Sequence, residues 1–154
     1  MKNLFKLFLP TALCLFAFNL LVSCDDKDQP KDPDQLPDMA QVFIADYFGG
    51  QNITKVTYDE KNKDWEVYLD NGTSVTFDKD GNWTEVEAPA LKTIPFGIAP
   101  EPIGNYIKAN YDGYGINEIE KNSYRYEVVL TNGQTDGPEL FFSLSGEYQG
   151  SDMD

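Results

Sequence analysis

The stretch WEVYLDNG at residues 65–72 recurs in altered form as YEVVLTNG at residues 126–133. Five of the eight positions are identical, and the two copies begin 61 residues apart. Apolar and polar side chains alternate at the start of each copy, which is typical of a strand that has one face in the core. Each copy ends in Asn-Gly, a strong signal for a two-residue β-hairpin. The sequence therefore predicts two equivalent strands, each followed by a tight turn.

The similarity extends to both sides of these strands. A helical pattern of apolar residues precedes each copy, at residues 37–48 and 100–111, and a glycine follows each pattern. Further alternating stretches follow the Asn-Gly turns, at residues 74–87 and 139–149. We interpret the pattern as a tandem duplication of a unit of about 50 residues.

The predicted fold class is α+β, with two helix-plus-four-stranded antiparallel meander units that share one sheet and place their helices on one face. A single unit of this size buries too little surface to be stable alone, which favours a shared core. The predicted boundaries are a signal peptide at 1–23, a disordered acidic and proline-rich tether at 24–36, and one domain at 37–149. Within that domain lie repeat 1 (37–88), a linker (89–98) and repeat 2 (99–149), and a disordered tail follows at 150–154.

The N-terminus has the pattern of a secretory signal. Lys2 and Lys6 precede an apolar run at residues 7–22, which is too short and too interrupted for a typical membrane-spanning helix. Residues 21–24, LVSC, resemble the lipobox of bacterial lipoproteins, and this resemblance implies cleavage before Cys24 and acylation of its thiol. The acids that follow resemble an export signal of surface lipoproteins, although a plain solubilising linker explains them equally well. We expect a secreted, lipid-anchored protein of the bacterial outer membrane, on the periplasmic side or the cell surface.

Composition excludes several classes of function. Removal of residues 1–23, which contain two lysines and no acid, changes the net charge from −14 to −16. Nucleic acid is therefore not expected as a partner, and the membrane is expected as one only through the lipid anchor. The chain has no histidine, and Cys24 is the single cysteine after residue 23, so histidine-based catalysis and disulfides within the domain are excluded. We expect no enzymatic activity and no cofactor.

The run from Trp65 to Trp83, with LDNG followed by VTFDKDGNW, resembles the PepSY-like, beta-lactamase-inhibitor-like family of secreted bacterial proteins. The resemblance covers residues 36 to about 149. It implies a helix-plus-sheet tandem repeat, secretion and no established catalysis. The second half departs from the pattern, since FSLSG at residues 142–146 stands where FDKDG is expected.

Asp78, Asp80 and Asn82 form a weak candidate for a calcium site. Their spacing begins like an EF-hand loop, but Gly81 comes one ligand too early. A tight hairpin turn explains the same residues, so no metal is expected.

The sheet face opposite the helices is the candidate binding surface. Alternation places Glu66, Tyr68, Glu127, Val129 and Phe141 on this face, where large apolar side chains are unusual for a solvated surface. Scattered surface hydrophobics are the simpler explanation. The expected function is a non-catalytic binding or inhibitory module for a protein or peptide, with a basic partner favoured by the charge. The alternative is a structural envelope lipoprotein that self-associates, for example as a homodimer.

Overall fold

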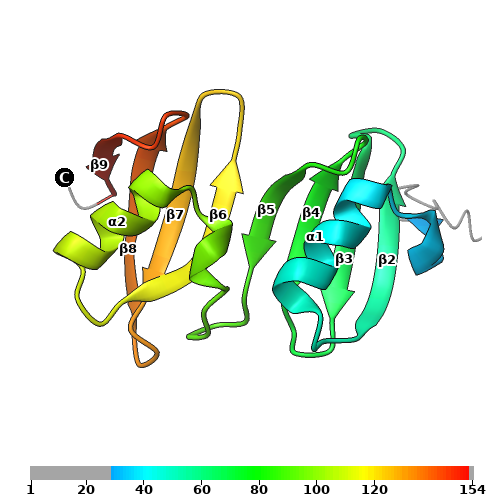
Figure 1. The fold of residues 1–154 in the computed structure, drawn as a ribbon, viewed down its shortest axis with the longest axis horizontal. Coiled ribbons are helices and arrows are strands. Elements are labelled where there is room, and N and C mark those ends of the chain that lie inside the picture. The colour runs from blue at the N-terminus through cyan, green and yellow to red at the C-terminus, as the bar shows by residue number, and fades with distance from the viewer. Residues whose placement is uncertain (1–28, 153–154) are drawn as a thin grey trace, which may run out of the picture.

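The computed structural model describes residues 29–152 (Figure 1). The described chain contains nine strands, two α-helices and two short 3-10 turns. In chain order these are β1 (Gln29–Pro30), η1 (Pro33–Gln35), α1 (Asp38–Phe48), β2 (Ile53–Asp59), β3 (Asp64–Leu69), β4 (Ser74–Asp78), β5 (Trp83–Glu87), η2 (Phe96–Ile98), α2 (Glu101–Asn110), β6 (Gly115–Lys121), β7 (Arg125–Thr131), β8 (Asp136–Ser143) and β9 (Tyr148–Ser151).

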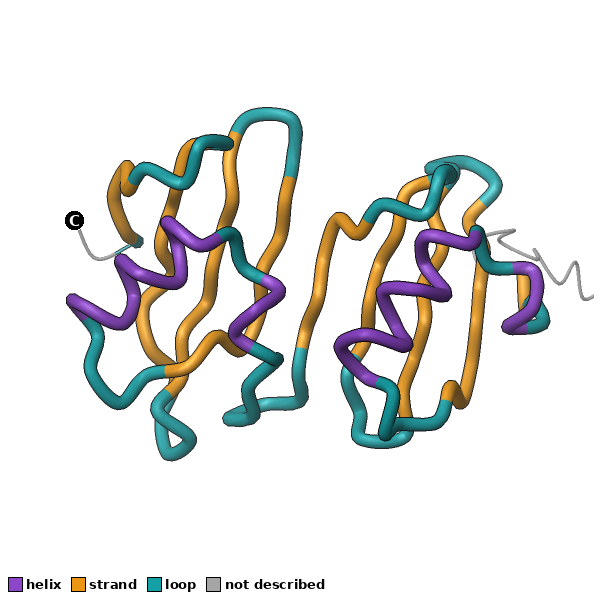
Figure 2. The backbone as a smooth tube through the Cα atoms, in the orientation of Figure 1, coloured by secondary structure: helices purple, strands orange, loops and turns teal. Residues whose placement is uncertain are grey.

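All nine strands form one sheet in sequential order, and each strand pairs antiparallel with the next. Both helices lie over the same face of this sheet, α1 over the β2–β4 end and α2 over the β6–β8 end (Figures 1 and 2). The strands β5 and β6 cross the middle of the sheet between the two helices (Figure 1). One face is thus covered by helices, and no helix of the described residues lies on the other.

The predicted fold class is wrong. The described chain is a mostly β structure with a single nine-stranded antiparallel sheet and two helices of 11 and 10 residues, rather than two helix-plus-four-strand units. The short strand β1 adds a ninth strand at the free edge of β2 through Gln29 and Pro30, and β5 pairs directly with β6, so all nine strands form one sheet.

The alternation of side chains across the strands is as predicted. Val67 and Leu69 of β3 and Val128 and Leu130 of β7 are buried on the helix side of the sheet. A row of fully buried aliphatic side chains runs across the sheet at this level, one residue from each strand from β2 to β8: Val56, Val67, Val75, Val86, Ile119, Val128 and Leu140. Trp65, which was expected in the core, is half-buried, and its ring centre lies 4.6 Å from that of Tyr58, with the two ring planes tilted by 48°. Burial of this row by the helices fixes which face of every strand points away from them.

Two hairpin turns pack tightly against the first turns of the helices. Gly81, between β4 and β5, has a φ of +89°, and a side chain there would meet Pro37 at 2.8 Å. Gly146, between β8 and β9, has a φ of +86°, and a side chain there would meet Pro102 at 2.8 Å. Glycine is required at both positions for its backbone conformation and for this close approach. The contacts seat each helix on the sheet.

Several residues outside the predicted repeats take part in this structure. Pro33–Gln35, in the predicted tether, form η1, and Leu36 after them is buried. Ile94 and Ile98, in the predicted linker, belong to the core, and β9 extends to Ser151. The predicted signal peptide and the predicted acylation site at Cys24 lie outside the described residues.

Candidate functional site

The face of the sheet away from the helices is polar and strongly acidic. The register aligns one row of side chains across this face from β3 to β8: Glu66, Thr76, Glu85, Glu120, Glu127 and Phe141. A second row, two residues along the strands, contains Tyr68, Ser74, Glu87, Glu118, Val129 and Glu139. We call the surface formed by these two rows the open face.

The structure places the predicted binding residues on the open face but divides them into two groups. Val129 and Phe141 are diagonal neighbours on β7 and β8, since Glu127 pairs with Phe141 and Val129 pairs with Glu139. Tyr68 lies on β3, five strands from Phe141, which corresponds to about 24 Å at the usual strand spacing. The aromatic side chains of the open face therefore flank it rather than form one apolar patch.

Each of these two aromatic rings lies under a cation from a neighbouring position. The Lys55 ammonium lies 4.9 Å from the ring centre of Tyr68. The Arg125 guanidinium lies 4.0 Å from the ring centre of Phe141, and its Nε also donates to Glu127 at 2.9 Å. Such contacts show that both ring faces accept a positive charge in this environment.

Four glutamates at the centre of the open face were missed by the sequence analysis. Glu85 of β5 pairs directly with Glu120 of β6, and Glu87 of β5 pairs directly with Glu118 of β6. We call these four residues the glutamate seam. The signal was present as two similar tripeptides, EVE at residues 85–87 and EIE at residues 118–120, each with a core residue between two acids. The sequence did not reveal that the two tripeptides pair with each other.

The electrostatics of the seam are unfavourable for ionised carboxylates. Partial burial, followed by the charges of Glu85, Glu87, Glu120 and Glu139, raises the pKa of Glu118 to about 7. Burial and neighbouring glutamates also raise the pKa of Glu85. Like charges directly opposite each other destabilise a pair of strands. The seam is therefore a destabilising feature in the middle of the sheet.

Charge is better compensated beside the seam. Hydrogen bonding from Arg125 lowers the pKa of Glu127, and partial burial works in the opposite direction. With a further hydrogen bond from Asn122, the pKa stays below its ordinary value. Glu139 nearby behaves in the opposite way, since burial and the charge of Glu127 raise its pKa. Arg125 thus contacts Glu127 and Phe141. It does not compensate the negative charge of the seam in the same way.

A hollow of about 240 Å³ opens on the same face beside Glu85. Its lining residues come from β2 to β5: Thr57, Asp59, Asn62, Asp64, Glu66, Thr76 and Glu85. Four of these seven residues are acidic and none is basic. The acidic surface therefore extends from the seam to the β2–β3 end of the open face.

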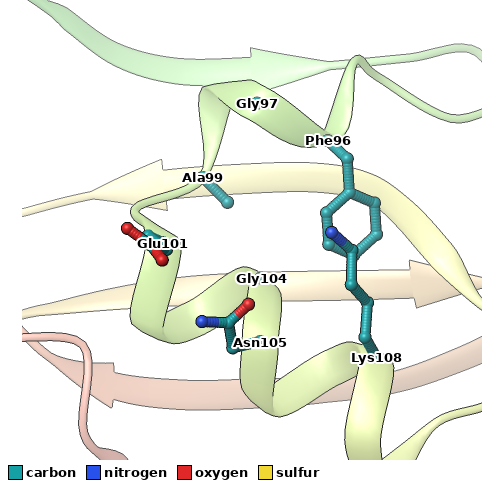
Figure 3. A pocket seen from close by; sticks show the side chains of 7 residues that line it. All are labelled: Phe96, Gly97, Ala99, Glu101, Gly104, Asn105 and Lys108. Atoms are coloured by element: carbon teal, nitrogen blue, oxygen red, sulfur yellow. The ribbon is translucent and has the colours of Figure 1, made fainter.

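Another hollow, of about 280 Å³, lies on the helix side between η2 and α2 (Figure 3). The Lys108 side chain reaches toward Phe96 there, and its ammonium lies 4.9 Å from the ring centre. Glu101 and Asn105 project from α2 along the opposite side of the hollow (Figure 3). This hollow contains none of the predicted site residues, and its few polar groups do not converge on one point.

The calcium candidate forms a self-contained turn. Oδ1 of Asp78 accepts hydrogen bonds from the backbone N–H groups of Asp80 and Asn82, both at 2.9 Å. Oδ2 accepts from the Asn82 side chain at 2.9 Å, and Asp80 pairs with Lys79. Partial burial works to raise the pKa of Asp78, but the hydrogen bonds from Asn82, Asp80 and Gly81 outweigh it and hold the pKa below its ordinary value. These contacts use the carboxylate oxygens as turn-stabilising acceptors.

Residues 29–152 contain neither a clustered metal site nor a helix that could span a membrane. No group of three or more Asp, Glu, His or Cys side chains in that range is arranged to hold a metal ion. The two helices of the described chain are too short and too polar to cross a membrane.

The fold is that of an open-faced antiparallel sheet protein, with helices on one face and an acidic second face. The described residues form no evident catalytic centre. The chain belongs to the family described as "Putative beta-lactamase-inhibitor-like, PepSY-like", whose model matches residues 63–149. The resemblance noted in the sequence is thereby confirmed. No curated protein matches the chain.

Three solved structures from Bacteroides are similar along most of their length. A protein of Bacteroides thetaiotaomicron described as a "putative calcium-regulated periplasmic protein" is 34% identical, with a TM-score of 0.73 over 81% of this chain and 96% of its own. A "putative periplasmic protein" of Bacteroides vulgatus is 32% identical, with a TM-score of 0.74 over 83% of this chain and 98% of its own. A second Bacteroides vulgatus protein, described as periplasmic and "of unknown function", is 28% identical, with a TM-score of 0.71 over 81% and 98%.

Proposed function

We propose that the chain is a non-catalytic binding module of the bacterial envelope, and that its open face docks a cationic segment of a protein or peptide. The observation that carries the proposal is the direct pairing of Glu85 with Glu120 and of Glu87 with Glu118 across the centre of the sheet. A sheet that needed only stability would place opposite charges or uncharged residues at these positions. Local violations of this kind are expected where a surface serves binding.

Charge complementarity identifies the occupant. The open face combines the glutamate seam with Glu66, Glu127 and Glu139, and its cations Lys55 and Arg125 already lie over aromatic rings. A segment rich in lysine or arginine would neutralise the seam, and its cations would compete with Lys55 and Arg125 for the rings of Tyr68 and Phe141. The net charge of −16 after removal of residues 1–23 would also steer such a partner toward the protein at low salt.

An envelope location supports this role. Three solved relatives are described as periplasmic, and we infer the same compartment for this chain. Anchoring at Cys24 in the outer membrane extends this proposal and is motivated by the LVSC motif alone. The calcium regulation named for one relative does not enter the proposal, because Asp78 directs its oxygens at its own turn.

Self-association through the open face is not favoured. Two copies facing each other would bring two glutamate seams together. Like-charge contacts in an interface cost on the order of 2 kcal/mol or more. The alternative of a self-associating structural protein would thus require a different surface.

The test compares two double variants with equal loss of charge. Glu66→Gln with Glu120→Gln removes two charges from the open face, and Glu101→Gln with Glu147→Gln removes two from α2 and the β8–β9 turn. Binding of a labelled deca-lysine peptide is measured by fluorescence anisotropy at pH 8 and low salt. We expect the first pair to weaken binding at least about fivefold, or roughly 1 kcal/mol, and the second pair less than about twofold. Equal effects of the two pairs would show that net charge, and not the open face, attracts the peptide.

A further inference from the structure

We propose that docking on the open face is linked to proton release: near neutral pH Glu118 is protonated in a fraction of the unoccupied molecules, and it loses this proton to solvent when a cationic segment binds. The inference rests on the proposed function and assigns a regulator to the same surface. Its basis is the geometry around Glu118, where acidic side chains converge from three strands.

The surroundings of Glu118 are defined by the register of the sheet. Glu87 lies directly opposite on β5, and Val129 lies directly opposite on β7. The charges that act most strongly on the Glu118 carboxyl are negative, and they come from β5, β6 and β8: Glu85, Glu87, Glu120 and Glu139. The apolar Val129 on one side and the acids on the other both disfavour an ionised carboxylate.

The backbone holds Glu118 in this position. A β-bulge lies between Ile116 and Glu118. The side chain of the bulged residue, Asn117, points toward the segment that follows β5. Its Nδ2 donates to the carbonyl oxygens of Ala88, Pro89 and Lys92 at 3.2, 3.1 and 2.7 Å. These contacts fix the end of β5 against β6 and keep Glu87 facing Glu118.

The combined effect places the titration of Glu118 in the neutral range. Burial and the neighbouring acids raise its pKa to about 7, so the carboxyl is about half ionised at that pH. A bound cation would favour the ionised form and lower this pKa again. Affinity for the cation must then rise with pH, because at low pH the cation competes with the proton.

The expected size of the coupling follows from the pKa values. If binding lowers the pKa of Glu118 from about 7 to roughly 5.5, the linkage relation gives about an eightfold tighter dissociation constant at pH 8 than at pH 6. Lysine side chains keep their charge over this range, since their usual pKa is about 10.4. A lysine peptide with both ends blocked therefore reports only on the protein.

The experiment measures binding of N-acetylated, C-amidated deca-lysine to the chain of residues 25–154 at pH 6 and pH 8, at one fixed low ionic strength. Wild type is expected to bind about five to ten times more tightly at pH 8. Glu118→Gln imitates the protonated carboxyl, so it should bind at both pH values about as the wild type binds at pH 6. The matched control Glu101→Gln, on the helix side, should keep the wild-type pH dependence.

The outcomes separate this inference from the proposed function. Absence of deca-lysine binding at both pH values overturns the proposed function and this inference together. Binding by wild type with less than a twofold change between pH 6 and pH 8 overturns the proton linkage alone. A Glu118→Gln variant that keeps the full pH dependence assigns the coupling to another group and also overturns the proposal.

A measurement on the wild type covers the case in which Glu118→Gln fails to fold. Carbon-13 NMR of glutamate-labelled protein should show one carboxyl that titrates near pH 7, and saturation with deca-lysine should move this midpoint down by at least one pH unit. A spectrum in which every glutamate titrates below pH 6 without peptide contradicts the proposal.

Discussion

Replacement of Glu118 by Gln should stabilise the free protein at alkaline pH. The glutamine side chain has nearly the same shape as glutamate but carries no charge. The substitution therefore removes a negative charge that is repelled by the negative charges of Glu85, Glu87, Glu120 and Glu139. Most substitutions of half-buried residues destabilise a protein, so a stabilising effect is a stringent outcome. It would show directly that the seam costs stability.

The magnitude follows from the raised pKa. A change from 4.5 to about 7 corresponds to roughly 3.4 kcal/mol if the full effect is realised. Glu118 is only partly buried, and solvent screening reduces such a value strongly, so we expect about 1 kcal/mol. For a domain of this size, that gain should raise the melting temperature at pH 8 by about 3 °C.

The sign of the pH dependence is fixed by the direction of the shift. Because the folded-state pKa of Glu118 is raised above its unfolded value, folding takes up a proton between about pH 4.5 and pH 7. The contribution of the protonated carboxyl to stability is therefore complete below pH 4.5 and is lost as the pH rises through 7. Gln stays neutral, so the gain from Glu118→Gln should be largest at pH 8 and close to zero at pH 5.

The assay is urea unfolding followed by tryptophan fluorescence at pH 5 and pH 8, with Glu101→Gln as the matched control. Glu101 carries the same charge but lies on α2, away from the seam. Equal stability of wild type and Glu118→Gln at pH 8, or equal gains at pH 5 and pH 8, would refute the reasoning about the seam.

Four further predictions test other parts of the structure. Ala at both Tyr68 and Phe141 should leave folding nearly intact, since both are half-buried on the open face, and should weaken deca-lysine binding by roughly 2 kcal/mol; unchanged binding would remove the rings from the site. Ile119→Ala should cost about 2–5 kcal/mol, since Ile119 is fully buried where β5 meets β6, and unfolding should remain a single calorimetric transition; two separate transitions would show that the halves fold independently. Chelator and added calcium should leave the melting temperature unchanged, because Asp78 is engaged by its own turn, and a calcium-dependent rise would restore that site. Cys24→Ser should abolish fatty-acid labelling and membrane fractionation, and a variant that keeps both would rule out acylation there.

The sequence predicted local structure better than the overall fold. Period-two alternation places Val67 and Val128 in the core, because a strand with one covered face must send alternate side chains inward. The helical stripes at residues 37–48 and 100–111 correspond to α1 and α2 within a residue or two at each end. These features depend on short-range spacing alone, which a single sequence contains.

The errors arose where pairing between distant segments decides the structure. Polar and proline-rich composition indicated a disordered tether, yet Gln29 and Pro30 pair with Tyr58 and Thr57 at the edge of the sheet. An edge strand needs hydrogen bonds on one side only, so proline is tolerated there and composition gives little warning. The predicted units likewise left open which strands would join them, and the structure shows that β5 pairs directly with β6.

The same limitation explains why the candidate site was only partly found. Tyr68, Val129 and Phe141 attracted attention because apolar side chains on a solvated face are conspicuous, whereas glutamates on such a face look ordinary. Glu85 and Glu120 become unusual only when the register shows them directly opposite each other, 35 residues apart in the chain. Their cost to the sheet depends on that pairing, and so does their capacity to hold a cation between two strands. If the open face were only a solvated surface, replacing its seam with uncharged residues would raise stability at no cost to any other property. The binding experiments with Glu118→Gln and Glu120→Gln therefore decide what the glutamate seam provides in exchange for the stability it removes.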